Sequence, residues 1–255
     1  MIFTIVLSLA SCGSTLGEDT IGFEKKNTMV IAHRGLSGLE VENTEAAFIA
    51  AGQRSYYGIE ADVRRTADGK FVICHDDNLK RISGEDISVE ESTLSELMGV
   101  DLLDRQGVKS DSTHLTALDR YISICKEYDK QAILELKSSF TKEEIAQIVD
   151  IIKDMDYINR VTFISFDYDN LLFVRELSPE QSVQYLFSKY TPEIKDRLIR
   201  DRIDVAIKHT ALSKRLLDDF HSAGLKVNCW TVDNKFIAEQ LAGLGVDFIT
   251  TNILE

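Results

Sequence analysis

From residue 29 onward, short apolar runs alternate with stretches whose apolar residues recur every three or four positions. Strand-like runs fall at 29–34, 57–63, 71–75, 131–137, 161–166, 182–187, 205–209, 226–232 and 246–251. Helical periodicity covers 43–54, 142–156, 168–177, 193–202, 212–223 and 234–243. The last two stretches end near Gly224 and Gly245, as helices often do. Strands that alternate with helices predict βαβ units and a parallel sheet.

The number of these units predicts a closed barrel. If 57–63 and 71–75 form one extended region at a single barrel position, eight strand and helix units remain, the number that closes a (β/α)8 barrel. A doubly wound open sheet is the alternative, but it normally has a glycine-rich phosphate turn after its first strand, and Gly35-Leu36-Ser37-Gly38 matches that turn poorly. We therefore expect an α/β fold of the TIM-barrel class. A small insertion over the barrel mouth is expected at 76–115, where only 94–98 has a helical pattern.

Ionisable side chains gather where three predicted strands end: His33, Arg34, Glu60, Asp62, His75, Glu135 and Lys137. In TIM barrels the chemistry takes place at the carboxyl ends of the strands. Side chains two residues apart on a strand point to the same face, so Glu60 and Asp62 are expected to face the lumen together. Glu135 and Lys137 repeat this arrangement on the next strand of the barrel.

Three carboxylates that face one lumen repel each other unless protons or a cation intervene. Oxygen ligands of this kind suit a hard divalent ion such as Mg²⁺ or Ca²⁺. Alternatively, these acids form structural ion pairs with Arg34 and Lys137 inside the barrel. So many inward ionisable groups are costly to bury without a function, which favours the metal site.

The two histidines are candidates for a general acid and a general base, because the pKa of imidazole suits both roles at neutral pH. The planar guanidinium of Arg34 is suited to a phosphate oxygen, and Lys137 adds a point charge. Together with a metal ion, these groups are the ones needed to split a phosphate ester. The sequence therefore predicts metal-assisted phosphoryl chemistry, with His33 and His75 as the proton-transfer pair.

The order of the motifs resembles the glycerophosphodiester phosphodiesterase family over roughly residues 29 to 252. The matching elements are His33-Arg34-Gly35, Glu42-Asn43-Thr44, Glu60-Ala61-Asp62, His75-Asp76 and Glu135-Leu136-Lys137. This resemblance implies a barrel of the phospholipase C-like phosphodiesterase type. It implies His33 and His75 as catalytic residues, and Glu60, Asp62 and Glu135 as ligands of the metal. The implied reaction converts a glycerophosphodiester to sn-glycerol 3-phosphate and an alcohol.

Two further residues are candidates for substrate binding beside Arg34 and Lys137. Glu42 begins a helical pattern, where it either hydrogen-bonds the site or caps the helix. Family members usually have a proline before this glutamate, whereas this chain has Val41. Trp230, the single tryptophan, stands in a segment that looks like the family's penultimate-strand motif. It either packs against the glycerol end of a substrate or belongs to the core.

The amino-terminal residues 2–11 contain no charge and end in Leu9-Ala10-Ser11-Cys12, which looks like a bacterial lipoprotein signal. The apolar stretch is too short to span a bilayer as a helix. We therefore expect a signal peptide at 1–11, a lipid on Cys12, a tether at 12–28 and the barrel at 29–255. This arrangement predicts export to the bacterial cell envelope, with membrane contact only through the lipid anchor.

The net charge of −13 argues against nucleic acid or an anionic membrane as the main partner, because both require a basic surface. The partner expected instead is a small-molecule glycerophosphodiester. Cys74, Cys125 and Cys229 are an odd number at wide spacings, so they indicate neither a complete disulfide framework nor a zinc site. We expect them to be small buried hydrophobic residues.

Two other functions fit the same fold. A phospholipase that acts on lipid headgroups would require an apolar rim for acyl chains, whereas the 76–115 insertion is largely polar. A catalytically inactive surface binding protein would be expected to lack at least one site residue, and every position of the motifs is filled. Fold alone does not separate these functions.

Overall fold

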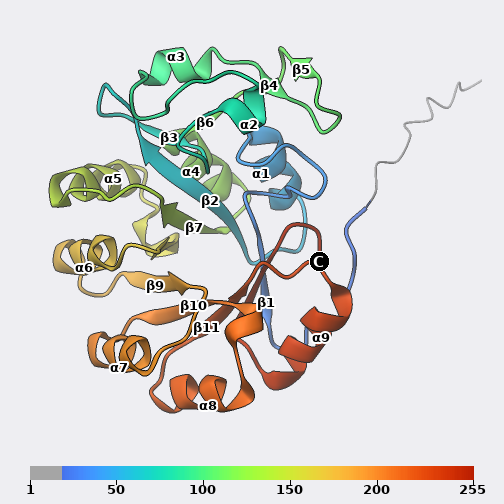
Figure 1. Ribbon diagram of the computed structural model, residues 1–255, viewed down its shortest axis with the longest axis vertical. Coiled ribbons are helices and arrows are strands. Elements are labelled where there is room, and N and C mark those ends of the chain that lie inside the picture. The colour runs from blue at the N-terminus through green and yellow to red at the C-terminus, as the bar shows by residue number, and fades with distance from the viewer. Residues whose placement is uncertain (1–18) are drawn as a thin grey trace, which may run out of the picture.

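Eight parallel strands close into a barrel in the computed structural model, which describes residues 19–255 (Figure 1). In order around the barrel they are β1 (Met29–Ala32), β2 (Gly58–Arg65), β7 (Gln131–Leu136), β8 (Val161–Ser165), β9 (Ser182–Phe187), β10 (Asp204–Lys208), β11 (Val227–Trp230) and β12 (Phe248–Thr251). Strand β1 closes the ring because Ile31 pairs with Thr250 of β12 on one side and with Gly58 of β2 on the other. The predicted TIM-barrel fold is confirmed.

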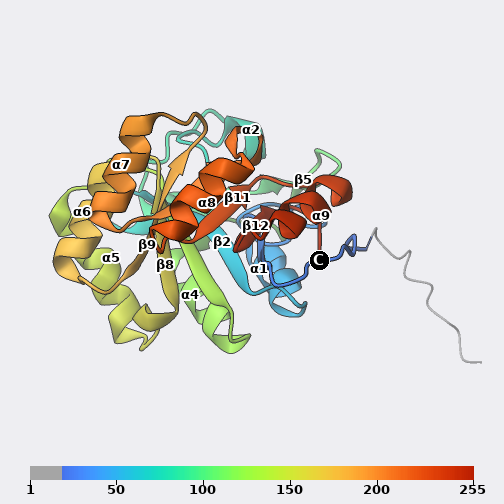
Figure 2. The same ribbon diagram turned by 90° about the horizontal axis from the view of Figure 1, so that it is seen from below.

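Helices surround the barrel (Figure 1). They are α1 (Glu45–Gly52), α4 (Leu118–Glu127), α5 (Lys142–Asp154), α6 (Tyr168–Leu177), α7 (Pro192–Asp201), α8 (Lys214–Ser222) and α9 (Lys235–Leu244), with short 3₁₀ turns at Ile158–Arg160 and His209–Ala211. The view from below shows α8 and α9 in front of the strands (Figure 2). Six of these seven helices begin at a Thr, Asp, Ser or Asn whose side chain accepts a backbone N–H. Helix α4 was missing from the predicted set, because Ala117 at its start provides no such cap.

The described residues supply seven barrel helices rather than the eight expected. After β12 the chain pairs with the residues that precede β1: Ile21 and Leu254 form a parallel bridge, and Glu255 N donates to Ile21 O at 3.0 Å. Phe23 is buried against the barrel core. The described part of the expected 12–28 tether is therefore packed against the barrel. The predicted signal peptide at 1–11 and Cys12 lie outside the described residues.

The insertion between β2 and α4 forms a small subdomain with its own core. It comprises β3 (Phe71–Ile73), α2 (Lys80–Ser83), α3 (Leu94–Met98), β4 (Leu102–Leu103), β5 (Lys109–Ser110) and β6 (Thr116–Ala117). Strand β3 pairs antiparallel with β2 beyond the barrel, and β6 pairs antiparallel with β3. The insertion stands beside the barrel mouth, at the top of Figure 1, rather than over it.

Alternation along the strands divides the interior into two layers. Outward residues such as Leu134 and Leu136 belong to the large core between barrel and helices. An inner cluster takes one residue from each of six strands: Ile31, Ile133, Ile164, Leu186, Ala206 and Phe248. This inner layer fills the barrel, and the polar residues two positions further along β1, β7 and β12, namely His33, Glu135 and Thr250, line its mouth.

The cysteines of the barrel can be compared with their expectation. Cys74, Cys125 and Cys229 are buried, as predicted, and no disulfide joins them to one another. Burial raises the pKa of each of these thiols to about 12, so all three act as small apolar residues. Between residues 19 and 255, no helix is long and apolar enough to cross a bilayer.

Candidate active site

The turn after β1 places His33 and Arg34 at the barrel mouth. Gly35 has φ of +75°, and a Cβ added there would lie 2.6 Å from the backbone carbon of Ala47, so only glycine fits. Arg34 also adopts a left-handed conformation, with φ of 56°. This conformation aims the Arg34 N–H at Glu60 Oε2, 2.7 Å away. The His-Arg-Gly motif is thus a tight turn that joins β1 to the carboxylates of β2.

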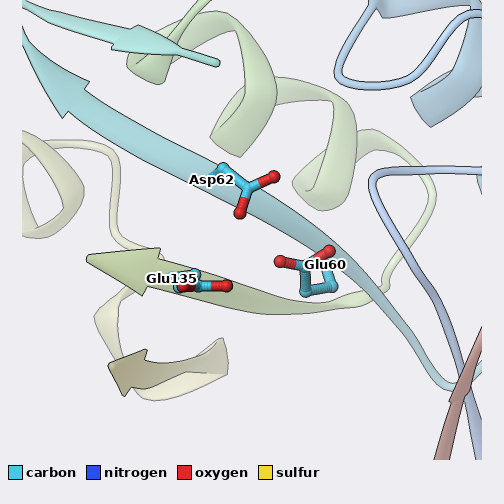
Figure 3. Close-up of side chains that lie close together, drawn as sticks. All are labelled: Glu60, Asp62 and Glu135. Atoms are coloured by element: carbon cyan, nitrogen blue, oxygen red, sulfur yellow. The ribbon is translucent and has the colours of Figure 1, made fainter. Parts of the chain in front are cut away.

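Three carboxylates meet inside the mouth, two from β2 and one from β7 (Figure 3). Asp62 lies opposite Glu135 in the parallel register, and Glu60 is two residues earlier on the same face as Asp62. One oxygen from each of the three groups lies within 4.8 Å of the others. All three residues are buried, with at most 7% of the surface of each exposed. The predicted cluster of Glu60, Asp62 and Glu135 is therefore present.

The three carboxyl groups differ in pKa because their surroundings differ. Burial, together with the charges of Asp62 and Glu135, raises the pKa of Glu60 well above its ordinary value. Burial and the charge of Asp62 raise the pKa of Glu135 to about 7. For Asp62, burial acts in the same direction, but Arg34 and Lys137 outweigh it and hold its pKa below the ordinary value. Without a cation, Glu60 and Glu135 therefore hold their protons more tightly than ordinary carboxyl groups do, whereas Asp62 loses its proton more readily.

Ion pairing accounts for only part of this cluster. Arg34 Nε lies 3.3 Å from Asp62 Oδ2, and Lys137 Nζ lies 2.9 Å from Glu135 Oε1. Glu60 has no Arg or Lys partner among the described residues; its nearest base is His33 Nε2 at 3.9 Å. Glu60 Oε1 and Asp62 Oδ1 are buried without a hydrogen-bond partner among residues 19–255. Unpartnered carboxylate oxygens that converge in this way fit a hard divalent ion.

Without metal, the stability of the protein is expected to decrease as the pH rises from about 4.5 to about 7. Because the folded-state pKa of Glu135 is about 7, against an ordinary 4.5, the folded protein retains a proton that the unfolded chain releases in this window. Relative to Glu135→Gln, which cannot ionise, the wild type should lose on the order of 2 kcal/mol of unfolding free energy. Urea unfolding of both proteins in EDTA, across this pH range, measures this difference. Unfolding free energies that change with pH in the same way for both proteins would contradict the expectation.

Both predicted catalytic histidines line the mouth, and each has a partner at Nδ1. His33 Nδ1 lies 2.7 Å from Asn252 Oδ1, and His75 Nδ1 lies 2.7 Å from Asp76 Oδ1. Burial, reinforced for His33 by the charge of Arg34, lowers the pKa of both imidazoles. Because Nδ1 of each ring is occupied by this partner, Nε2 is the nitrogen available for proton transfer in the cavity.

A chain of charges joins the insertion to this site. Glu42 accepts from Arg34 Nη1 at 2.9 Å and from Arg81 Nη2 at 2.7 Å. Arg81 Nε also donates to Asp76 Oδ2 at 2.6 Å, so this residue of α2 supports both Arg34 and the partner of His75. Of the two roles considered for Glu42, the hydrogen bond to the site is therefore correct. Thr44, not Glu42, caps α1.

A cavity of about 180 Å³ opens beside the carboxylates. His33, Arg34, Glu60, His75, Glu135 and Lys137 form its polar side. Its apolar lining consists of Phe166, Trp230, Ile164 and Leu186, and the rings of Phe166 and Trp230 meet edge to face with centroids 5.6 Å apart. Trp230 thus lines the cavity, and its Nε1 is buried without a hydrogen-bond partner in the part of the chain that the structure describes.

The sequence patterns missed several residues of this site. Asn252, Arg81 and Phe166 stand in no motif considered above, because each acts through a contact between segments that are far apart in the chain. Asn43 did stand in a recognised motif, but its role was not predicted. It adopts φ of 60°, and its Nδ2 donates to Asp62 Oδ2 at 2.8 Å. An asparagine, which tolerates this left-handed conformation, was the available signal.

Comparisons with known proteins agree with this geometry. The model of the glycerophosphoryl diester phosphodiesterase family matches residues 33–255. A glycerophosphodiester phosphodiesterase of Caldanaerobacter subterraneus subsp. tengcongensis is 29% identical over 88% of this chain and 94% of that protein.

Solved structures give the same picture. A phosphodiesterase of Oleispira antarctica, in complex with the product sn-glycerol-3-phosphate, is 30% identical with a TM-score of 0.80, over 88% of this chain and 92% of the other. A glycerophosphodiester phosphodiesterase of Thermotoga maritima is 26% identical with a TM-score of 0.73, over 88% of this chain and 94% of that one. The barrel and nearly the whole chain are therefore shared with these proteins.

Proposed function

The chain belongs to the glycerophosphoryl diester phosphodiesterase family and is a phosphoric diester hydrolase, and we propose that it converts glycerophosphodiesters to sn-glycerol 3-phosphate and a free alcohol in a metal-dependent reaction. One observation carries this proposal: two histidines, an arginine and three buried carboxylates line one small cavity. The relative from Oleispira antarctica, solved with sn-glycerol-3-phosphate, supports the product.

The two sides of the cavity suit the two parts of such a substrate. Arg34 and Lys137 offer N–H donors to the phosphate oxygens on the polar side. Phe166 and Trp230 provide an apolar surface for the carbon chain of the glycerol unit. The cavity, about 180 Å³, is below the range of roughly 300–1,000 Å³ that drug-sized ligands occupy, which favours a small substrate over an intact phospholipid.

Glu60, Asp62 and Glu135 would hold a divalent ion, either Ca²⁺ or Mg²⁺, at the floor of the cavity. When bound, such an ion polarises a phosphoryl oxygen and lowers the pKa of an attacking oxygen. The hydrogen bonds from Arg34 N to Glu60 and from Asn43 Nδ2 to Asp62 fix the direction of these carboxylates. Such outer contacts orient the ligands.

His33 and His75 carry out the proton transfers of the proposed reaction. One imidazole accepts a proton from the attacking oxygen, and the other donates a proton to the departing alkoxide. Both rings are held by a hydrogen bond at Nδ1, so each presents Nε2 to the substrate. The attacking oxygen belongs either to water or to a neighbouring glycerol hydroxyl, which would give a cyclic phosphate first.

Release of glycerol 3-phosphate from glycerophosphocholine by the purified protein tests this function. The assay should be run after EDTA treatment and again after Mg²⁺ or Ca²⁺ is restored, and an enzyme-coupled readout specific for glycerol 3-phosphate identifies the product. Metal-dependent release would establish the reaction. No release from a panel of glycerophosphodiesters, by folded protein with metal present, would refute it; phospholipid vesicles assayed in parallel distinguish a headgroup phospholipase from a binding protein.

We further propose that the protein is exported and anchored to the bacterial cell envelope through a lipid on Cys12. The uncharged run at 2–11 that ends in Leu9-Ala10-Ser11-Cys12 supports this location. Mass spectrometry of the membrane fraction should find a lipid-modified cysteine at the mature amino terminus. The Cys12→Ser protein should lack the lipid and remain unprocessed; a wild type without lipid would contradict the proposal.

A further inference from the structure

Asn252 holds the side chain of the catalytic candidate His33. Its Oδ1 lies 2.7 Å from His33 Nδ1 and 2.8 Å from Ser37 Oγ. Asn252 follows β12 directly, and β12 pairs with β1, so barrel closure brings the two residues together across 219 positions of sequence. Whether Nδ1 or Nε2 of neutral His33 carries the proton therefore depends on whether the oxygen or the nitrogen of the Asn252 amide faces Nδ1.

Asp233 determines how this amide is oriented. Its Oδ2 accepts from Asn252 Nδ2 at 2.6 Å, while its Oδ1 accepts from the Asn252 backbone N–H at 2.7 Å and from Thr251 Oγ1 at 3.0 Å. A carboxylate has no proton to donate. If the amide were reversed, its oxygen would face Asp233 Oδ2 at that short distance, and two acceptors would repel each other. Asp233 therefore directs Asn252 Oδ1 toward His33.

We propose that Asp233 is a positioning residue that fixes the tautomer of His33 through Asn252. Because Asn252 Oδ1 can only accept, neutral His33 carries its proton on Nδ1 and presents an unshared electron pair at Nε2. In this form His33 can accept a proton at Nε2, as a general base must. Neither Asp233 nor Asn252 lines the cavity, so their effect on the substrate passes through His33 alone.

Asp233→Asn is the direct test. In this variant the side-chain oxygen of Asn at position 233 can still accept the Asn252 backbone N–H. Its NH₂ group then replaces Oδ2 and faces Asn252 Nδ2, so two donors meet. Asn252 is then favoured in the reversed orientation, which offers an N–H to His33 Nδ1 and places the imidazole proton on Nε2. A general base typically raises the reaction rate by about 10²- to 10⁴-fold. Asp233 is exposed and acts only through Asn252, so its effect should be smaller. We expect kcat to fall by about tenfold with little change in KM.

The matched control is Asp247→Asn. Asp247 accepts from His221 Nε2 at 2.9 Å and from the Val227 backbone N–H at 2.8 Å. Like Asp233, Asp247 accepts one backbone N–H and one side-chain N–H, but it precedes β12 and lies at the opposite end of the barrel from the site. Kinetic parameters of this variant should equal those of the wild type.

The exchange variant, Asp233→Asn together with Asn252→Asp, should restore activity. It keeps one carboxylate and one amide but reverses their places. The carboxylate at position 252 accepts from His33 Nδ1 in either orientation, and the amide at position 233 donates to it while its oxygen accepts the backbone N–H. A kcat that returns to within about threefold of the wild type is expected, whereas a purely structural role of Asp233 predicts no recovery.

The tautomer itself is read by ¹⁵N NMR of histidine-labelled protein, with the His33 signals identified by their loss in His33→Ala. The spectra are recorded at about pH 8, above the ordinary imidazole pKa of about 6.5, so that the neutral ring is observed. The wild type should show a protonated Nδ1, and Asp233→Asn should show proton density moved to Nε2. An unchanged tautomer in Asp233→Asn would overturn the inference. This measurement needs no substrate, so its failure is distinct from failure of the proposed function.

Discussion

Replacing His33 by alanine is expected to lower kcat by about 10³-fold while the barrel stays folded. The side chain lies at the mouth, where it contacts Asn252 and approaches Glu60, and it contributes nothing to either hydrophobic core layer. Its removal takes away a proton-transfer group but little packing. Steady-state release of glycerol 3-phosphate gives kcat, and a circular dichroism melting curve verifies the fold.

His221→Ala is the control for this experiment. His221 also pairs with a carboxylate, Asp247, but it lies on α8, outside the barrel. The His221→Ala protein should retain the kcat of the wild type. An active His33→Ala protein that works without metal would refute the two-histidine mechanism, because both the proton transfer and the metal would then be dispensable.

Removal of divalent metal is expected to abolish turnover and also to lower the melting temperature. An ion that binds only the folded state, present at about 100 times its dissociation constant, adds about 2.7 kcal/mol of stability. For a chain of this size, such a difference corresponds to roughly 5–10 °C in Tm. Calorimetry in EDTA, and then after titration with Mg²⁺ or Ca²⁺, measures the shift and also shows which ion binds more tightly.

Glu60→Gln separates the metal from other causes of this shift. Glutamine keeps the shape of the side chain, and it resembles the protonated form that the raised pKa of Glu60 favours in the metal-free protein. The variant should therefore fold as well as metal-free wild type, yet gain little Tm from added ions and turn over at least about 100-fold more slowly. Full stabilisation of Glu60→Gln by metal would remove Glu60 from the proposed ligand set.

Much of the candidate site was predictable because its residues lie at short spacings on strands. Glu60 and Asp62 face the same way by the two-residue period alone, and the structure confirms that they meet Glu135. Gly35 stood in the His-Arg-Gly motif, and the structure explains its presence by its φ and by the closeness of Ala47. The predicted roles of these residues in catalysis and metal binding stay predictions until the variants above are measured.

The missing parts depend on contacts between distant segments. Arg81 reaches Glu42 across 39 residues, and Asn252 reaches His33 across 219. No local pattern marks either residue, since a lone arginine on a short helix or an asparagine after a strand is usually solvated. Helix α4 was also missed, since no capping side chain marks its start. The described part of the expected tether, residues 19–28, contacts the last residues of the chain, and no local pattern indicates that contact.

The sequence by itself determined the barrel, the order of its strands and the residues that end them, because periodicity and capping act over a few positions along the chain. Only the tertiary structure decided which acids are left without a partner, how Arg81 and Asp233 support the two histidines, and where Trp230 lies. Barrel closure brings the end of β12 next to that of β1, and the insertion carries Arg81 to Glu42 and Asp76. Side chains from distant segments then become neighbours, and burial shifts their proton affinities.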